Sequence, residues 1–257
     1  MPPITLTRDL GVMPIGITKA HEMADADGKF YIVKFKENAL GSVKVLINEY
    51  VAGKIAEHLD LPCAKCYIAE IDSTLAPTIE INGIPVSVSS HFAVEKLNDI
   101  YVVPFIFKLI PTCQNKDKYP DIMNFDVWLY NWDRNNSGNY LILTKPDGYH
   151  FYIIDHGHCF NLDWSVVILA GMIGAFAPKS LIPQMSELVT TDVQMEGAIT
   201  KIEAIDDNFL RNLVDDVPAD WIVDPLDKDA LKDYIVQQKK ELRKLIFTNK
   251  AKFANWK

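Results

Sequence analysis

The residues best suited to chemistry are two aspartates and an asparagine near the middle of the chain. Asp133 and Asn139 lie in the polar run 131–139, and Asp155 follows the apolar run 151–154. Phosphoryl transfer uses such a set, because one carboxylate orients a hydroxyl while an amide oxygen and a second carboxylate hold Mg²⁺ against the phosphates. The pattern therefore predicts a catalytic loop at Asp133 and a metal site at Asn139 and Asp155.

A β-hairpin would bring these side chains together. Two β-rich runs, 140–143 and 149–154, are separated by a Pro-Asp-Gly turn signal at 146–148. Asn139 precedes the first run and Asp155 follows the second. Pairing of the two strands would place both residues at the same end of the ribbon.

A lysine and a glutamate in the first part of the chain form a second candidate pair. Lys34 lies on the strongest predicted strand, 30–36, on a face otherwise marked by apolar residues. Glu49 is the only charge along one stripe of the predicted helix 43–59, and a buried carboxylate needs a cationic partner. A strand lysine paired with a helix glutamate holds nucleotide phosphates in kinase-type folds. Two alternatives stay open: Lys34 extends from an edge strand to water, or Glu49 lies at the rim of its helix.

The predicted elements divide the chain into two parts. The runs with strand character are 4–10, 15–23, 30–36, 64–71, 78–81 and 84–88, with one helix packed on the sheet that they form. The stretch 89–98 predicts an extended connection, and helical patterns dominate the rest, as in 199–214 and 231–247. The chain is thus expected to be α+β, with a mainly antiparallel N-terminal lobe, residues 1–98, and a mostly helical C-terminal lobe containing the hairpin, residues 99–257.

Composition and charge exclude several classes of protein. Of 257 residues 49% are hydrophobic and 23% charged, which is ordinary for a globular protein, and the net charge of −8 argues against nucleic-acid binding. The uncharged run between Trp164 and Lys179 is shorter than the roughly 20 residues of a membrane span, and its part 166–176 predicts a core helix rather than an interface helix. No signal peptide begins the chain, so the protein is expected in the cytoplasm.

The four cysteines do not complete a metal site. Cys63 and Cys66 have CxxC spacing, but no second CxxC or histidine pair follows at a usual distance. Cys113 and Cys159 stand alone. Reduced, partly buried thiols are therefore expected, and they fit a cytosolic protein.

With these residues in view, the chain resembles the HipA-like kinases, relatives of the HipA toxin kinase within the protein-kinase and phosphoinositide-kinase-like fold. Four matches in the family's order carry the resemblance. They are DGKFYIVKFK at 27–36, NEY at 48–50 with LDLP at 59–62, NWDRN at 131–135, and IDHGHCF at 154–160.

The resemblance implies a two-lobed kinase fold that uses ATP and Mg²⁺ to phosphorylate a serine or threonine hydroxyl of a protein. Lys34 would contact the α- and β-phosphates, with Glu49 orienting it, and Asp133 would be the catalytic aspartate. The remaining implied roles are Mg²⁺ binding by Asn139 and Asp155, and phosphate covering by the short loop from Gly11 to Pro14. The toxin's DNA-bound partnership is not carried over, in agreement with the acidic charge.

Two departures from the family pattern bear on metal and phosphate binding. Asn139 follows Asp133 by six residues where related kinases have five, and Asn136 follows it by three. An insertion ending at Asn139 is favoured, because Tyr140 must begin a strand. The phosphate loop is poor in glycine, with only Gly11 and Gly16.

Two other functions compete with the kinase. A pseudokinase or scaffold would use the same fold to hold a nucleotide or a protein partner. A metal-dependent hydrolase would use Asp155, His156 and His158 with Asp133, but neighbouring residues on a strand point to opposite faces, which disfavours a shared metal. No motif identifies the phosphoryl acceptor or the oligomeric state.

Overall fold

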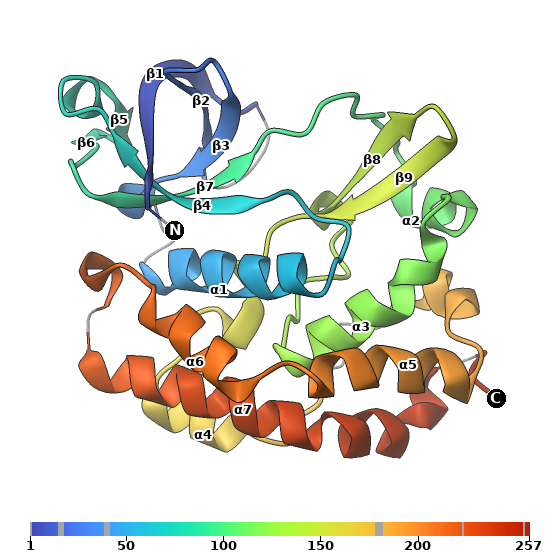
Figure 1. Ribbon diagram of the computed structural model, residues 1–257. Helices are drawn as coiled ribbons and strands as arrows, with labels where there is room; N and C mark the ends of the chain where they lie inside the picture. Colours follow the sequence, from blue (N-terminus) through green and yellow to red (C-terminus); the bar gives the residue numbers. More distant parts are fainter. Residues whose placement is uncertain (1, 15–17, 39–41, 178–181, 223, 254) are drawn as a thin grey trace.

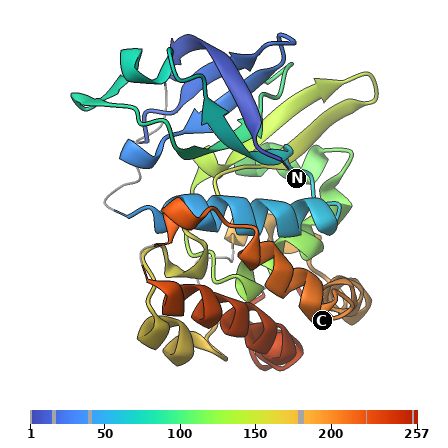
Figure 2. The same cartoon turned by 60° about the vertical axis from the view of Figure 1, so that its left-hand side comes forward.

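The computed structural model describes residues 2–14, 18–38, 42–177, 182–222, 224–253 and 255–257. A β-rich part formed by the strands of the first 95 residues lies on one side of a long helix, residues 44–58, and most of the other helices lie on its opposite side (Figures 1 and 2). The hairpin stands beside the β-rich part (Figure 1). The protein is therefore α+β, as the sequence predicts.

The β-rich part is a closed five-stranded barrel rather than an open sheet. Its strands follow the order β1-β2-β3-β7-β4, with antiparallel neighbours except for the parallel pair β1 and β4 that closes it. Its own core includes Leu6, Met23 and Val33, all with 0% exposure. The strands are β1 (Ile4–Val12), β2 (His21–Asp25), β3 (Phe30–Lys34), β4 (Cys66–Ile71) and β7 (Ser90–Glu95).

Three local predictions in this part need correction. The stretch 89–98 is not a connection, since β7 occupies most of it and pairs with both β3 and β4. The runs 78–81 and 84–88 contribute only the short strands β5 (Glu80–Ile81) and β6 (Ile84–Pro85), which pair with each other outside the barrel. β1 also continues past Leu10 to Val12, with irregular pairing near Gly11. The first residues of the predicted strand 15–23 lie outside the described part of the chain.

The long central helix α1 (Lys44–His58) is buried on most of its surface. The barrel covers one side and the helical part the other, as both views show (Figures 1 and 2). Its residues Leu46 and Tyr50 belong to the larger of the two hydrophobic cores. A charged side chain on this helix therefore has little access to water and needs partners within the protein.

The helical part is built around α7 (Pro225–Thr248), which packs against α3, α4, α5 and α6. Trp128 of α3 is fully buried, and its Nε1 donates a hydrogen bond to the Ile235 carbonyl at 2.9 Å. The other helices are α2 (Ile106–Leu109), α3 (Tyr119–Trp128), α4 (Val166–Met172), α5 (Asp192–Glu203) and α6 (Asp207–Asp215).

Two helix predictions need correction. The run 199–214 is not one helix, because Asp206 accepts hydrogen bonds from the backbone of Asn208 and Phe209 and so begins α6 as a new helix. α4 is only partly a core helix: Leu169 is buried, but Val167 on its other face is 81% exposed.

The predicted hairpin is present. β8 (Tyr140–Lys145) and β9 (Gly148–Ile153) pair in register from Tyr140 with Ile153 to Lys145 with Gly148. Gly148 has φ +129°, a conformation that suits glycine in a tight turn. The start of β8 and the end of β9 therefore lie side by side, as the sequence requires for Asn139 and Asp155.

All four cysteines are free thiols. Burial raises the pKa of Cys63 to about 12 and places that of Cys66 well above the ordinary value. Neither thiol is therefore activated for redox or metal chemistry. Among the described helices, none is both long enough and apolar enough to cross a bilayer.

Candidate active site

Lys34, Glu49 and Asp155 form one charged cluster drawn from three separate elements. Lys34 ends β3, Glu49 lies on α1, and Asp155 follows β9. The Lys34 ammonium donates to Glu49 Oε1 and lies 3.1 Å from Asp155 Oδ1. The Lys34 and Glu49 side chains are 14% and 3% exposed, while that of Asp155 is 45% exposed. Lys34 does not extend to water and Glu49 is not at a rim, so both alternative interpretations of these residues are wrong.

The electrostatics of this cluster are unequal. Burial disfavours the charged form of Lys34, but the carboxylates of Asp155 and Glu49 outweigh it and raise the lysine pKa. Burial raises the pKa of Glu49 to about 7, although Lys34 opposes the shift. Burial acts in the same direction on Asp155, yet Lys34 holds the pKa of this carboxyl well below its usual range. The cluster thus contains a lysine whose charged form is favoured, a half-exposed aspartate whose charged form is favoured, and a buried glutamate with a pKa of about 7.

The backbone around Asp155 turns sharply next to α1. Asp155 has φ +59°, in the left-handed region that aspartate adopts more readily than most residues. The next amide, that of His156, donates to Glu49 Oε2 at 2.9 Å. Glu49 therefore contacts Lys34 with one oxygen and the Asp155 segment with the other.

The predicted catalytic loop places Asp133 against Asn139. Asn139 Nδ2 donates to the Asp133 carbonyl and to Asp133 Oδ2, both at 2.9 Å. The Asn139 carbonyl accepts from the Ile154 amide at 3.0 Å, which ties the loop to the residue before Asp155. The structure thus brings Asp133, Asn139 and Asp155 to one end of the hairpin.

Asn136 and Asn139 have different surroundings. Asn136 is exposed, and its Oδ1 accepts from the Gly138 amide at 3.0 Å, capping the short 3-10 helix 137–139. Asn139 is 4% exposed and uses its amide nitrogen on Asp133. Within the described part of the chain no hydrogen bond engages Asn139 Oδ1, so this oxygen is the one left to face a cation.

Arg134 holds the catalytic loop in place by buried hydrogen bonds, a role that was not predicted from the sequence. Its guanidinium, 1% exposed, binds both carboxylate oxygens of Asp126 through Nε at 3.2 and 3.0 Å. It also donates to the carbonyls of Asn139 and Ile154 at 3.2 and 2.7 Å, and lies 3.0 Å from His156 Nδ1. The available signal was Asp126 itself, since an aspartate inside an apolar helical run requires a buried partner.

Comparison with known proteins identifies the family. The family model of the HipA-like kinases matches residues 9–256, a range that contains all five residues of the site. The chain belongs to the HipA-like kinase family. Phosphoryl transfer is therefore the class of chemistry expected of this HipA-like kinase, in agreement with the resemblance seen in the sequence.

Solved structures share the fold of this HipA-like kinase. The proinflammatory kinase CtkA of Helicobacter pylori matches 98% of this chain and 100% of its own, with a TM-score of 0.63 and 17% identity. Fam20 of hydra, solved with a sugar, matches 95% of this chain and 86% of its own, with a TM-score of 0.52 and 8% identity. A search of curated proteins found no significant match.

The two histidines of the HipA-like kinase motif do not form a metal site. Burial, reinforced by Arg134, places the pKa of His156 well below its usual range, and Nδ1 of this neutral ring faces the guanidinium. The His158 ring packs on Trp132 at 4.4 Å, with Nδ1 3.7 Å from Asp133 Oδ2. No group of three or more His, Cys, Asp or Glu side chains within the described ranges is arranged to hold a metal. Since His156 faces a cation, the hydrolase alternative lacks one of its ligands.

The loop implied to cover the phosphates begins inside β1. Gly11 has φ +103°, and its amide donates to Asp9 Oδ1 at 3.0 Å. Met13 N donates to the Ala20 carbonyl at 2.7 Å, and Pro14 is exposed. Gly16 lies outside the described residues. Gly11 thus lies near the end of β1 and Pro14 in the connection to β2, and their binding role stays a prediction.

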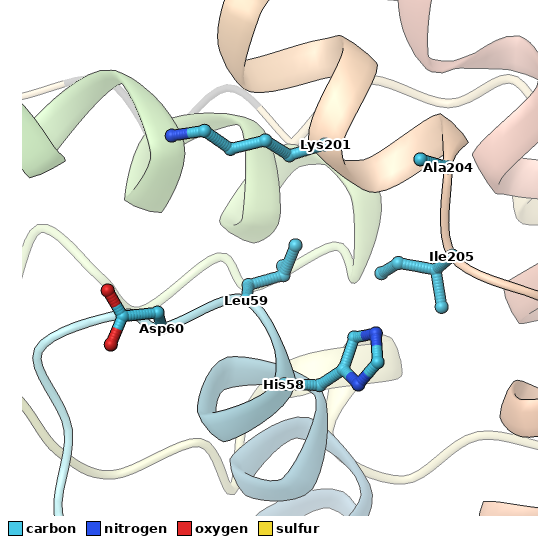
Figure 3. A pocket seen from close by; sticks show the side chains of 6 residues that line it. All are labelled: His58, Leu59, Asp60, Lys201, Ala204 and Ile205. Carbon is cyan, nitrogen blue, oxygen red and sulfur yellow. The ribbon is translucent and has the colours of Figure 1, made fainter.

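A separate hollow of about 260 Å³ lies where the end of α1 faces the end of α5. Figure 3 shows Leu59 and Ile205 facing each other across it, while the charged ends of Asp60 and Lys201 point away from Ile205. These charges are used elsewhere, because Asp60 pairs with Lys118 at 2.8 Å and Lys201 with Asp121 at 2.7 Å. None of the predicted site residues lines the hollow.

Proposed function

We propose that this HipA-like kinase uses ATP and Mg²⁺ to transfer a phosphoryl group to a serine or threonine hydroxyl of a protein. The observation that carries the proposal is the Lys34 cluster. One cation from the barrel contacts a buried carboxylate on α1 and the exposed carboxylate of Asp155, beside the Asp133 and Asn139 pair. Phosphoryl transfer relies on this kind of positioned charge.

Each side chain has a definite part in the proposed reaction. Lys34 binds the α- and β-phosphates, and Glu49 keeps the ammonium in place. Asp133 orients the acceptor hydroxyl and takes its proton as the oxygen bonds to the γ-phosphorus. The bond from the γ-phosphorus to the bridging oxygen breaks, and its electrons leave with ADP.

The residues present fit a magnesium ion. Mg²⁺ prefers hard oxygen ligands, and this site offers the exposed carboxylate of Asp155 and the uncommitted Oδ1 of Asn139. When bound, the ion would offset the negative charge of the phosphates. Asn136 is the weaker candidate ligand, because its oxygen already caps a turn.

The proposal includes a two-lobed organisation. Residues 1–98 would hold the nucleotide, with the connection from Gly11 to Pro14 over the phosphates, and residues 99–257 would supply the catalytic loop, the metal ligands and the acceptor surface. The expected partner is a protein substrate, bound without nucleic acid or membrane, which suits the net charge of −8. Free thiols, three of them buried, fit the cytoplasm as its compartment.

Calorimetric titration of ATP with and without Mg²⁺ tests the proposal. Wild-type protein should bind ATP more tightly with Mg²⁺, and Asp155→Ala should lose that gain. Asp147→Ala is the matched control, since Asp147 lies at the far turn of the same hairpin with a 64% exposed side chain. A folded Asp155→Ala protein with unchanged magnesium dependence would remove Asp155 from the metal site.

A pseudokinase or scaffold is the second candidate. It is favoured by the Lys34–Asp155 ion pair, which joins the phosphate-binding cation to the metal-binding carboxylate, and by the displaced Asn139. Transfer of labelled phosphate from ATP to a mixed protein substrate separates the two functions. A kinase should transfer phosphate at a rate that Asp133→Asn reduces by about a hundredfold or more. For a scaffold, the transfer rate of the wild type should not exceed that of Asp133→Asn.

A further inference from the structure

Asn48, which precedes Glu49 on α1, is completely buried, and both its amide nitrogen and its amide oxygen are hydrogen-bonded. Its Nδ2 donates to the Gly157 carbonyl at 2.8 Å and to the Leu162 carbonyl at 3.0 Å. Its Oδ1 accepts from Trp164 Nε1 at 2.8 Å. An amide with two donors and one acceptor engaged at 0% exposure is a strong anchor, because each partner would otherwise be left unpaired away from water.

All three partners of Asn48 lie on the segment 157–164, directly after Asp155. Within this segment Phe160, Asn161 and Leu162 have φ values of +55°, +67° and +63°. Such left-handed backbone is unfavourable for residues other than glycine and persists only where the surroundings hold it. The Leu162 carbonyl, one of the two that Asn48 binds, belongs to this stretch.

The segment also touches α1 closely at its start. A Cβ on Gly157 would lie 3.0 Å from Val45 Cγ1 and 3.3 Å from Glu49 Oε1, so glycine alone fits without a shift. With the Glu49 contact to the His156 amide, α1 holds the chain directly after Asp155 by several independent contacts.

We infer that Asn48 is a positioning residue for the metal site. It fixes the segment 157–164 to α1 and thereby sets the place of the Asp155 carboxylate relative to Lys34. This inference rests on the proposed function in one respect, the binding of magnesium by Asp155. Side chains that orient ligand-bearing groups in this way commonly change metal affinity by about 10–100-fold when removed.

A second buried asparagine provides a matched control. Asn124 is also at 0% exposure, but its Nδ2 donates to the Pro120 carbonyl of the same helix at 2.8 Å and lies 3.7 Å from Met195 Sδ. Within the described part of the chain, none of its hydrogen bonds reaches the segment after Asp155. Asn124→Ala therefore removes a buried amide without touching the anchor.

The experiment compares Asn48→Ala with Asn124→Ala in the full chain. Amide hydrogen exchange without ligand should become at least tenfold faster across 156–164 in Asn48→Ala and stay unchanged there in Asn124→Ala. In ATP titrations Asn48→Ala should lose about 10–100-fold of the magnesium-dependent affinity, with metal-free ATP affinity within about twofold of wild type.

Equal exchange across 156–164 in the two variants would overturn the inference, as would a parallel loss of metal-free and magnesium-dependent binding. Should Asn48→Ala fail to fold, Trp164→Phe removes the indole donor to Asn48 Oδ1 together with part of a buried ring, and it should change the exchange and the magnesium-dependent affinity in the same direction. Wild-type protein that binds no Mg²⁺-ATP would refute the proposed function instead. The exchange comparison would then decide by itself whether Asn48 anchors the segment.

Discussion

Two clusters of charge flank the Asp155 segment, and they are built differently. In the Lys34 cluster one cation serves two carboxylates from α1 and the end of β9, and Asp155 is 45% exposed. In the Arg134 cluster one cation binds one carboxylate, Asp126, and both side chains are 1% exposed. The first joins the barrel to the second half of the chain, whereas the second lies wholly within residues 126–156.

The Lys34 cluster can change its ion-pair partners when a ligand binds, whereas the Arg134 cluster has a structural role. Arg134 distributes its donors over Asp126, two backbone carbonyls and His156, and at 1% exposure it is closed to a ligand. Lys34 neutralises only part of the negative charge around it, and its open side faces solvent through Asp155. The buried, hydrogen-bonded Arg134–Asp126 pair makes its surroundings rigid. In the partly exposed Lys34 cluster, phosphates can replace a carboxylate on Lys34 and a cation can bind Asp155.

The largest effect is expected from Arg134→Met. Removing this cation leaves the buried Asp126 carboxylate with the Asn131 amide but without a positive charge beside it, so the free energy of unfolding should fall by about 3–5 kcal/mol. Urea unfolding followed by tryptophan fluorescence measures the loss. Arg243→Met is the control, because Arg243 pairs with Glu203 at 39% exposure and should cost under about 1 kcal/mol. A similar loss of unfolding free energy in both variants would contradict the structural role of Arg134.

Lys34→Met should damage binding more than stability. Loss of the phosphate-facing cation should weaken ATP binding about 10–100-fold, as for a charge-assisted contact. Stability should fall less than in Arg134→Met, because Glu49, with a pKa already near 7, can take up a proton and Asp155 reaches solvent. Calorimetry and urea unfolding of the two variants side by side test this. Unfolding of Lys34→Met as severe as that of Arg134→Met would show that the cluster is structural.

The smallest effect is a pH dependence that Glu49 alone should impose. Its pKa is raised from the ordinary 4.5 to about 7 by burial, so the folded chain binds this proton more tightly than the unfolded chain. Stability from this group is therefore full below pH 4.5 and is lost as the pH rises through 7. Wild type should lose on the order of 1–3 kcal/mol relative to Glu49→Gln between pH 5 and 8. Parallel stability curves in urea would show that Glu49 is charged throughout.

Sequence patterns alone determined the local parts of the site. The hairpin follows from two β-rich runs around a Pro-Asp-Gly turn, and the pairing of Tyr140 with Ile153 puts Asn139 near Asp155 as predicted. The apolar stripe around Glu49 favoured its burial but left a position at the rim of the helix open. Such patterns operate within about ten to fifteen residues, where spacing decides which side chains share a face.

Tertiary structure decided what joins distant segments. The parallel pairing of β1 with β4 closes the barrel, and β7 becomes a strand because β3 and β4 lie on either side of it. Two other features depend on side chains that meet across packed elements. They are the Arg134–Asp126 ion pair and the hydrogen bond from Asn48 to the Gly157 carbonyl. These contacts carry no periodic signal, since they arise only when hydrophobic burial has brought the elements together and each buried polar group must then find a partner.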